Sequence, residues 1–243
     1  MKKILLLAFI SIFIASCSGL DSIKVTESEY KIIAQRIIDM RMTHDESINE
    51  ANKILEPILA SQVVNELDKR KLEADNALIE AELVADYVDK IVVVGAKTDD
   101  QIIITGSTLS KSRTLGLLER DDQQKFYLSG VKDNNNGLIK HNLNLSIQYT
   151  SDKWRNYKTA TFCDKWQGCS DGEKLSITAT SKSAGNCSGF KCDYTEKMEL
   201  ELSSDFLSTS SNLGFSINFN SDKTSNKITI PPAYLKAYLQ LAK

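Results

Sequence analysis

The residues with the clearest chemistry are four cysteines that lie close together in the second half of the chain. They are Cys163, Cys169, Cys187 and Cys192, and the remaining cysteine, Cys17, is far from them near the start. In an exported protein, an even set of clustered cysteines is typical of disulfides. The short separations favour two local pairs, Cys163 with Cys169 and Cys187 with Cys192, although facing loops could cross-link instead. Zinc binding is the alternative, but neither separation has the short Cys-x-x-Cys form that zinc sites favour.

Aromatic side chains gather in the same segment. Trp154 and Trp166 are the two tryptophans of the chain, and Tyr157 lies between them. Basic residues alternate with these rings: Lys153, Arg155, Lys158 and Lys165. Loops often carry binding residues, and aromatic and arginine side chains dominate the energetics of many interfaces. Trp154, Tyr157 and Trp166 are therefore our candidate binding residues for a protein or a glycan. The alternative is that a tryptophan packs in the core and the disulfides only staple the loops.

Groups suited to acid–base catalysis are few. The chain has two histidines, and His44 is expected at an exposed helix start. His141 falls on the apolar side of an alternating strand pattern, which favours a core histidine with hydrogen-bond partners over a catalytic base. Glu196 also points to an apolar side, where an inward carboxylate could have a raised pKa. A partner such as Arg155 or a solvated strand end is the simpler explanation.

Motifs for nucleophilic, phosphate or metal chemistry are missing or incomplete. Gly-Asn-Cys-Ser-Gly at 185–189 has the spacing of a nucleophile elbow with Cys187 at its centre. That elbow needs a buried strand before it and a helix after it, and the surrounding sequence predicts neither. Phosphate-binding glycine loops and His-Glu-x-x-His helices are absent. We therefore expect no enzyme activity, no metal and no cofactor.

The start of the chain has the features of a targeting signal. Lys2 and Lys3 precede an apolar run at 4–15, as in a secretory signal. That run is shorter than the about 20 residues of a membrane-spanning helix. Its exit, Ile14-Ala15-Ser16-Cys17, resembles the lipobox of bacterial lipoproteins. The resemblance covers only this segment, and an ordinary secretory signal is the alternative.

The lipobox resemblance implies a specific processing of the chain. Residues 1–16 would be a signal peptide cut just before Cys17, and Cys17 would carry the lipid. Ser18, in place of an aspartate, implies the outer membrane if the cell is Gram-negative. Residues 17–25 would then form a lipidated tether. The protein would be anchored to the cell envelope by its lipid, either inside the periplasm or facing outward.

Length and charge set further limits. The 243 residues suffice for one large domain or two small ones with a real core. Thirty lysines and arginines stand against 32 aspartates and glutamates, so the net charge is −2. Nucleic-acid binding needs a basic surplus that displaces counterions. Nucleic acid is thus excluded as an expected partner.

Residues 26–90 predict helices. This stretch contains no glycine, and Pro57 is its only proline. Thr43 and Glu46 have the spacing of a capping box that starts a second helix. Pro57 either kinks that helix or opens a third one.

Apolar residues in this region recur at helical spacing. The faces expected to be buried are Tyr30, Ile33, Ile37 and Met40 on the first helix and Ile48, Ala51 and Leu55 on the second. A heptad-like seam follows at Ala60, Val64, Leu67, Lys71, Ala74, Leu78, Ala81, Ala85 and Val88. Packing of this seam against the first helix is favoured over a self-associating coiled coil, because Lys71 and the alanines weaken the seam.

Residues 91–243 predict antiparallel β-structure with a closing helix. One hairpin is expected at 91–95 and 101–106, and a second at 125–131 and 138–150 around the turn pair Asn136-Gly137. Further strands are expected at 156–162, 175–180, 194–202, 214–218 and 227–230, and a helix at 233–242. The predicted fold class is α+β: an N-terminal helical hairpin or stalk, then an antiparallel β-sandwich or curled barrel with a C-terminal helix.

Three functional hypotheses are compatible with this organisation. The first is a non-enzymatic envelope lipoprotein that acts as an adaptor for another envelope protein. The second is a lipoprotein that binds a glycan or peptidoglycan fragment by stacking on Trp154 or Trp166. The third and least favoured is an envelope hydrolase, which requires groups such as Glu196 and His141 to share one cleft.

Overall fold

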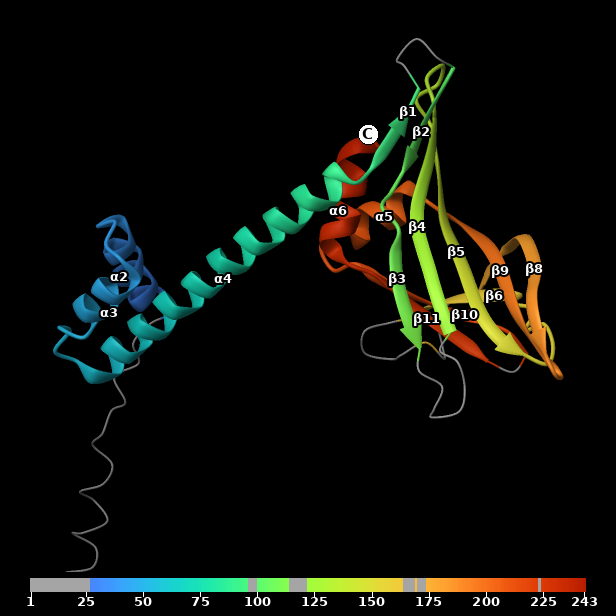
Figure 1. Ribbon diagram of the computed structural model, residues 1–243. Helices are drawn as coiled ribbons and strands as arrows, with labels where there is room; N and C mark the ends of the chain where they lie inside the picture. Colours follow the sequence, from blue (N-terminus) through green and yellow to red (C-terminus); the bar gives the residue numbers. More distant parts are fainter. Residues whose placement is uncertain (1–26, 96–99, 114–121, 164–168, 170–173, 223) are drawn as a thin grey trace, which may run out of the picture. The chain divides into compact units, whose positions relative to one another are not determined.

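The structure is a computed structural model that describes residues 27–95, 100–113, 122–163, 169, 174–222 and 224–243. These residues form five helices and eleven strands of an α+β protein (Figure 1). The chain divides into two compact units between Ala77 and Leu78, inside the long helix α4 (Pro57–Asp89). The expected signal peptide, tether and lipid-attachment residue Cys17 lie outside the described residues.

The first unit is helical. It contains α2 (Glu27–Asp39), α3 (His44–Ala51) and the first part of α4. The predicted capping box is confirmed: the Thr43 amide donates to Glu46 Oε2 at 2.8 Å, and the Glu46 amide donates to Thr43 Oγ1 at 3.4 Å. The Thr43 amide and hydroxyl both donate to the Glu46 carboxylate, and these two hydrogen bonds lower the pKa of Glu46. Pro57 opens α4, where its missing amide hydrogen costs nothing.

A small apolar core holds this unit together. Its buried residues are Ala34, Ile37, Ala51, Leu59, Val63 and Leu67. Two predicted inward residues are exposed instead: Met40 is 58% exposed and Leu55 is 98% exposed. Both lie outside the helices, since α2 ends at Asp39 and α3 at Ala51. The predicted seam of α4 is also interrupted, because Leu78 is 62% exposed.

The second unit contains two antiparallel sheets. The larger has the order β1-β2-β4-β5-β9-β8, with β3 also paired to β4, and the smaller has the order β11-β10-β6-β7. The larger sheet comprises β1 (Val92–Val94), β2 (Gln101–Thr105), β3 (Leu109–Arg113), β4 (Asp122–Asp133), β5 (Ile139–Ser151), β8 (Thr178–Ser188) and β9 (Lys191–Leu202). The smaller comprises β6 (Thr159–Cys163), β7 (Lys174–Ser176), β10 (Phe215–Asn220) and β11 (Ser225–Ile230). Two helices complete the unit, α5 (Ser204–Ser210) and α6 (Pro232–Leu241).

The β4–β5 hairpin forms as predicted and turns at Gly137, but its loop is longer than a two-residue Asn136-Gly137 turn, because Lys132 pairs with Ile139 and Asn136 has no positive φ. Gly137 has a φ of 72°, a backbone conformation that glycine adopts without strain. The Asp133 carboxylate accepts the amide of Asn135 at 2.8 Å and so fixes the start of the turn. The strand β5 then alternates buried and accessible residues as its sequence predicts. One face of the larger sheet is thus buried and the other is wet.

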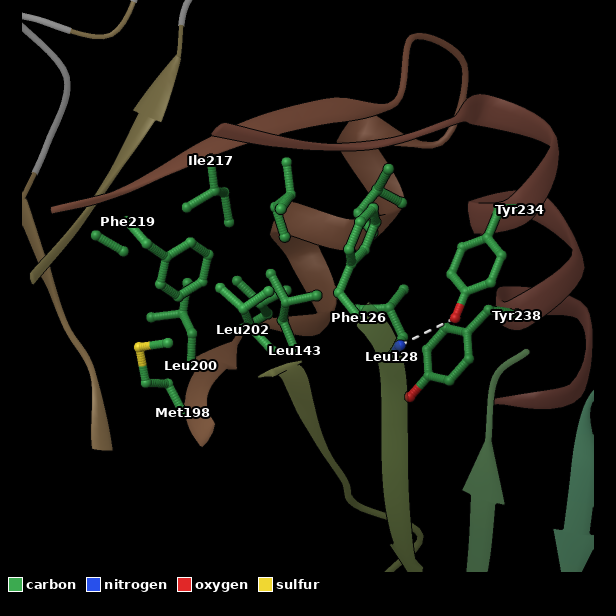
Figure 2. Close-up of a cluster of buried hydrophobic side chains, with 14 of the residues drawn as sticks. Phe126, Leu128, Leu143, Met198, Leu200, Leu202, Ile217, Phe219, Tyr234 and Tyr238 are labelled. Atoms are coloured by element: carbon green, nitrogen blue, oxygen red, sulfur yellow. Dashed lines mark hydrogen bonds between the residues drawn. The ribbon is translucent and has the colours of Figure 1, made fainter. Parts of the chain in front are cut away.

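One buried cluster takes side chains from both sheets and from α6 (Figure 2). Leu143 and Met198 come from the larger sheet, and Ile217 and Phe219 come from the smaller one. The Tyr234 hydroxyl of α6 accepts the Leu128 amide at 3.0 Å, as the dashed line in Figure 2 shows. The helix α6 is therefore tied to the larger sheet by a buried hydrogen bond as well as by apolar contact.

A closed barrel is not found among the described strands, which corrects that part of the predicted fold. The larger sheet ends at β1 on one side and at β8 on the other. The edge strand β1 is short, and the side chains of its three residues, Val92, Val93 and Val94, are each about half exposed. The opposite edge, β8, is polar and carries two register shifts.

No helix in the described part of the chain combines the length and the apolar character needed to cross a membrane.

Candidate functional site

The four clustered cysteines form the two local disulfides that their spacing favoured. Cys187 and Cys192 are bonded as directly opposite residues of β8 and β9. Cys163, the last residue of β6, is bonded to Cys169. All four sulfurs are thus in disulfide bonds in the structure, which leaves no thiolate in this set for the alternative of zinc binding.

The Cys187–Cys192 disulfide closes a tight turn that carries Phe190. Ser188 pairs with Lys191, so Gly189 and Phe190 are the two residues of the turn between the strands. Gly189 has a φ of 60°, which permits a two-residue hairpin turn. The Phe190 side chain is 97% exposed. An apolar ring is therefore presented to solvent on a turn that a covalent bond keeps in place.

Sequence reasoning did not identify Phe190 as a contact residue. The signal was present: a phenylalanine stands between a glycine and Lys191 inside a short Cys-to-Cys loop. A glycine turn closed by a disulfide cannot bury its middle side chain against its own strands. Trp154 and Trp166 were predicted as contact residues instead, because tryptophan is larger and more frequent in interface hot spots.

Trp154 is partly buried rather than displayed. Its ring centroid lies 4.4 Å from that of Tyr194, and Lys182 Nζ lies 5.7 Å from the ring. The ring packs against the main core cluster. Trp154 therefore forms no exposed stacking surface, and Trp166 lies outside the described residues.

Tyr157 is in the core, which corrects its expected place on a contact surface. It is 4% exposed, and its hydroxyl donates to Asn226 Oδ1 at 2.5 Å. Burial raises the pKa of Tyr157 to about 12. Its side chain supports the loop from within.

Arg155 extends from the same loop to a buried carboxylate. Its guanidinium donates to both oxygens of Asp122, at 2.5 and 2.9 Å, and Asp122 is fully buried. Asn226 Nδ2 donates to the same carboxylate at 3.2 Å. The guanidinium carbon also lies 4.1 Å from the centre of the Tyr149 ring. Burial opposes the charge of Arg155, but the hydrogen bonds to Asp122 and Tyr157 raise its pKa above the ordinary value.

Glu196 holds the backbone of this loop. Its Oε1 accepts the amides of Arg155 and Asn156, each at 3.1 Å, as well as the Tyr149 hydroxyl. Lys182 Nζ lies 3.4 Å from its other oxygen. Asn156 has a φ of 56°, which turns the chain so that consecutive amides converge on one carboxylate. Arg155 is thus a partner of Glu196 as expected, but through its main-chain amide, because its guanidinium pairs with Asp122.

His141 lies in a separate group near α5 and α6. It is 2% exposed, with Nδ1 2.8 Å from the Tyr238 hydroxyl and Nε2 3.2 Å from Ser204 Oγ. Burial lowers the pKa of His141. The described contacts match the expectation of a core histidine with hydrogen-bond partners.

The structure does not bring His141 and Glu196 together. His141 pairs with Leu202 in the β5–β9 ladder, whereas Glu196 pairs with Ile147. A strand rises by about 3.3 Å per residue, so these positions are about 20 Å apart along the sheet. The hydrolase alternative required these groups in one cleft, and the geometry does not meet that condition.

Comparisons with known proteins add no identity to this geometry. Within the described residues, no three or more histidine, cysteine, aspartate and glutamate side chains gather as a metal site would require. Searches of the sequence against models of protein families and against curated proteins find no match.

Proposed function

We propose that this chain is a non-enzymatic, lipid-anchored protein of the bacterial cell envelope that binds another envelope protein through Phe190. The observation that carries the proposal is the 97% exposure of this ring on a turn closed by the Cys187–Cys192 disulfide. Exposed large apolar side chains on rigid elements are what partner pockets bury. Cys17 provides the anchor, and Phe190 provides the contact.

The energetics favour this turn as a binding element. Burying a phenylalanine side chain completely contributes about 1.5–3 kcal/mol. Binding normally loses part of such a gain to the ordering of loops and side chains. The disulfide has already ordered this turn, so less of the gain is lost. Exposed Lys191 beside the ring favours a partner pocket with an acidic rim.

The body of the second unit supplies a rigid base for the turn. We infer that its two sheets pack face to face as a β-sandwich, because one buried cluster includes side chains from both. The strand β9 runs from the turn into the larger sheet, where it pairs with β8 on one side and β5 on the other. The turn that carries Phe190 is then supported by a packed core.

The test is cross-linking in intact cells followed by capture of the tagged, full-length lipoprotein. We expect one stoichiometric envelope protein with the wild type and at least a tenfold loss of it with Phe190→Ala. Leu213→Ala is the matched control, because Leu213 is also apolar and 77% exposed but lies elsewhere. Equal capture by the Phe190→Ala variant, or capture of lipid and wall fragments alone, would contradict the proposal.

The anchor is tested separately. With Cys17→Ala, we expect metabolic labelling with palmitate to disappear and the protein to leave the membrane fraction. Several acyl chains hold a protein firmly to a bilayer, because each buried methylene contributes about 0.8 kcal/mol. Unchanged labelling of the Cys17→Ala protein would show that the lipid is attached at another residue, and a wild type without labelling would show that the chain carries no palmitate.

A further inference from the structure

A cavity of about 550 Å³ lies over the larger sheet, on residues of β4, β5, β8 and β9. This volume falls within the range of about 300–1,000 Å³ that is usual for ligand pockets. Four polar side chains of its lining come from four adjacent strands: Gln123, Gln148, Thr195 and Ser183. They are consecutive cross-strand partners, so they form one row across the sheet.

This row lies on the face of the sheet opposite the core. The residues next to it along the strands, Gln124, Ile147 and Glu196, are buried on the other side. Alternation along a strand therefore directs Gln123, Gln148 and Thr195 away from the core. The row is accessible and ends at Ser183 of β8. A register shift between Ala184 and Cys187 follows next along this strand.

The row has hydrogen-bonding capacity to spare. Among the described residues, none of the four side chains makes a hydrogen bond within the chain. Each amide can donate and accept, and so can each hydroxyl. Asn186 in the same lining adds another amide. A ligand that both donates and accepts at several points would match this lining.

The charges of the lining narrow the ligand class. Asp193 lines the cavity, where its carboxylate accepts the Thr150 hydroxyl at 2.7 Å. The described lining residues include no lysine, arginine or histidine. Lys125 and Lys197 are in the next row along the strands and outside the lining. A lining that carries a carboxylate and, among its described residues, no cationic side chain disfavours anionic ligands.

We propose that this cavity is a binding site for a neutral saccharide. Each sugar hydroxyl both donates and accepts, and a sugar ring carries several of them, which is the pattern that the amide and hydroxyl row can satisfy. Phe190 does not line the cavity, so the inference does not rest on the proposed contact at Phe190. It gives the second unit a ligand of its own.

The experiment uses the purified mature protein and an array of neutral and anionic oligosaccharides with hexose, N-acetylhexosamine and deoxyhexose ends. We expect binding to at least one neutral glycan, followed by titration calorimetry with that glycan. Gln148→Ala and Thr195→Val should each weaken binding at least tenfold while the thermal midpoint stays unchanged. Gln101→Ala is the matched control, because Gln101 is an exposed glutamine of β2 outside the cavity.

Three results would overturn the inference. They are binding to no neutral glycan, binding to anionic glycans alone, and full affinity in both cavity variants. Phe190→Ala should retain saccharide binding, so a failure at this cavity and a failure at the hairpin tip are told apart.

Discussion

Arg155 and Asp122 form a two-pronged ion pair inside the second unit, with Nη1 and Nη2 of the arginine 2.5 and 2.9 Å from the two carboxylate oxygens. The arginine belongs to the loop between β5 and β6, and the aspartate is the first residue of β4. Parallel paired hydrogen bonds of this kind fix orientation as well as distance. The pair thus ties the loop that carries Trp154 to the strand beneath it.

Removing one partner of this pair should destabilise the second unit strongly. Asp122→Asn leaves the Arg155 charge buried without its carboxylate, which typically costs about 3–5 kcal/mol. The measurement is the free energy of unfolding in urea. Asp222→Asn is the control, because the Lys158–Asp222 pair is mostly exposed and such pairs contribute about 0–1 kcal/mol. Similar losses in both variants would mean that Asp122 is not the structural anchor proposed.

The Cys187–Cys192 disulfide should stabilise the protein modestly. The chain-entropy relation for so short a loop gives about 2 kcal/mol at 25 °C. We expect the double variant Cys187→Ser with Cys192→Ser to lose about that much in urea unfolding. The double variant should also capture less of the partner than the wild type does while it is still folded, because the disulfide no longer holds the turn. Unchanged capture by a turn without its disulfide would contradict the role of the bond in presenting Phe190.

His141 should make stability depend on pH in a defined direction. Burial lowers its pKa in the folded chain, while the unfolded chain keeps the ordinary value of about 6.5. As the pH falls, the histidine of the unfolded chain is protonated before that of the folded chain. The stability that the neutral His141 contributes is therefore fully present above pH 6.5 and is lost as the pH falls through the folded pKa.

The comparison of wild type with His141→Gln isolates this effect from other titrating groups. Between pH 7.5 and pH 5, the free energy of unfolding of the wild type should fall further than that of His141→Gln. Tyr238 and Ser204, which contact the imidazole, do not titrate in this range. Parallel pH profiles for the two proteins would argue against a buried neutral histidine.

Gly130 should tolerate no side chain. A Cβ added there would lie 2.6 Å from the Tyr238 hydroxyl, closer than such contacts occur. We expect Gly130→Ala to lower the free energy of unfolding by about 1–3 kcal/mol through overpacking. At Gly185 the nearest atom to an added Cβ is 3.5 Å away, so Gly185→Ala should be close to neutral. Equal thermal midpoints for the two variants would show that α6 moves aside without cost.

Sequence patterns predicted the parts of the fold that local chemistry decides. The capping box at Thr43, the glycine turn at Gly137 and the local disulfides each depend on residues a few positions apart. The alternation of β5 was equally readable, because one of its faces is buried along its whole length.

Other features depend on pairing between distant segments and left no such pattern. The strand predicted at 175–180 is two strands, β7 in the smaller sheet and β8 in the larger one, and β8 continues to Ser188. The sequence of β8 is largely polar and does not alternate, so it gave no strand pattern. The helix α5 was missed because its serines and threonines favour turns. Lys182 could not be assigned to Glu196 before the β8–β9 register was known.

The candidate sites divide in the same way. Tyr157 was predicted at a surface because its neighbours are basic, yet Asn226, which accepts its hydroxyl, is far along the chain. The saccharide cavity had no sequence signal at all, since its row of side chains exists only when four strands align.

The two edges of the larger sheet differ in a way that limits how copies of this protein could aggregate. The β8 edge is blunted by bulges and by a disulfide at its tip, whereas β1 has no second strand partner among the described strands and carries three half-exposed valines. Fibre growth through sheet edges needs two competent sides on every molecule. A molecule with one such side can join a single neighbour, and then the assembly stops at a pair. That asymmetry works against open-ended polymerisation of the protein through its sheet edges.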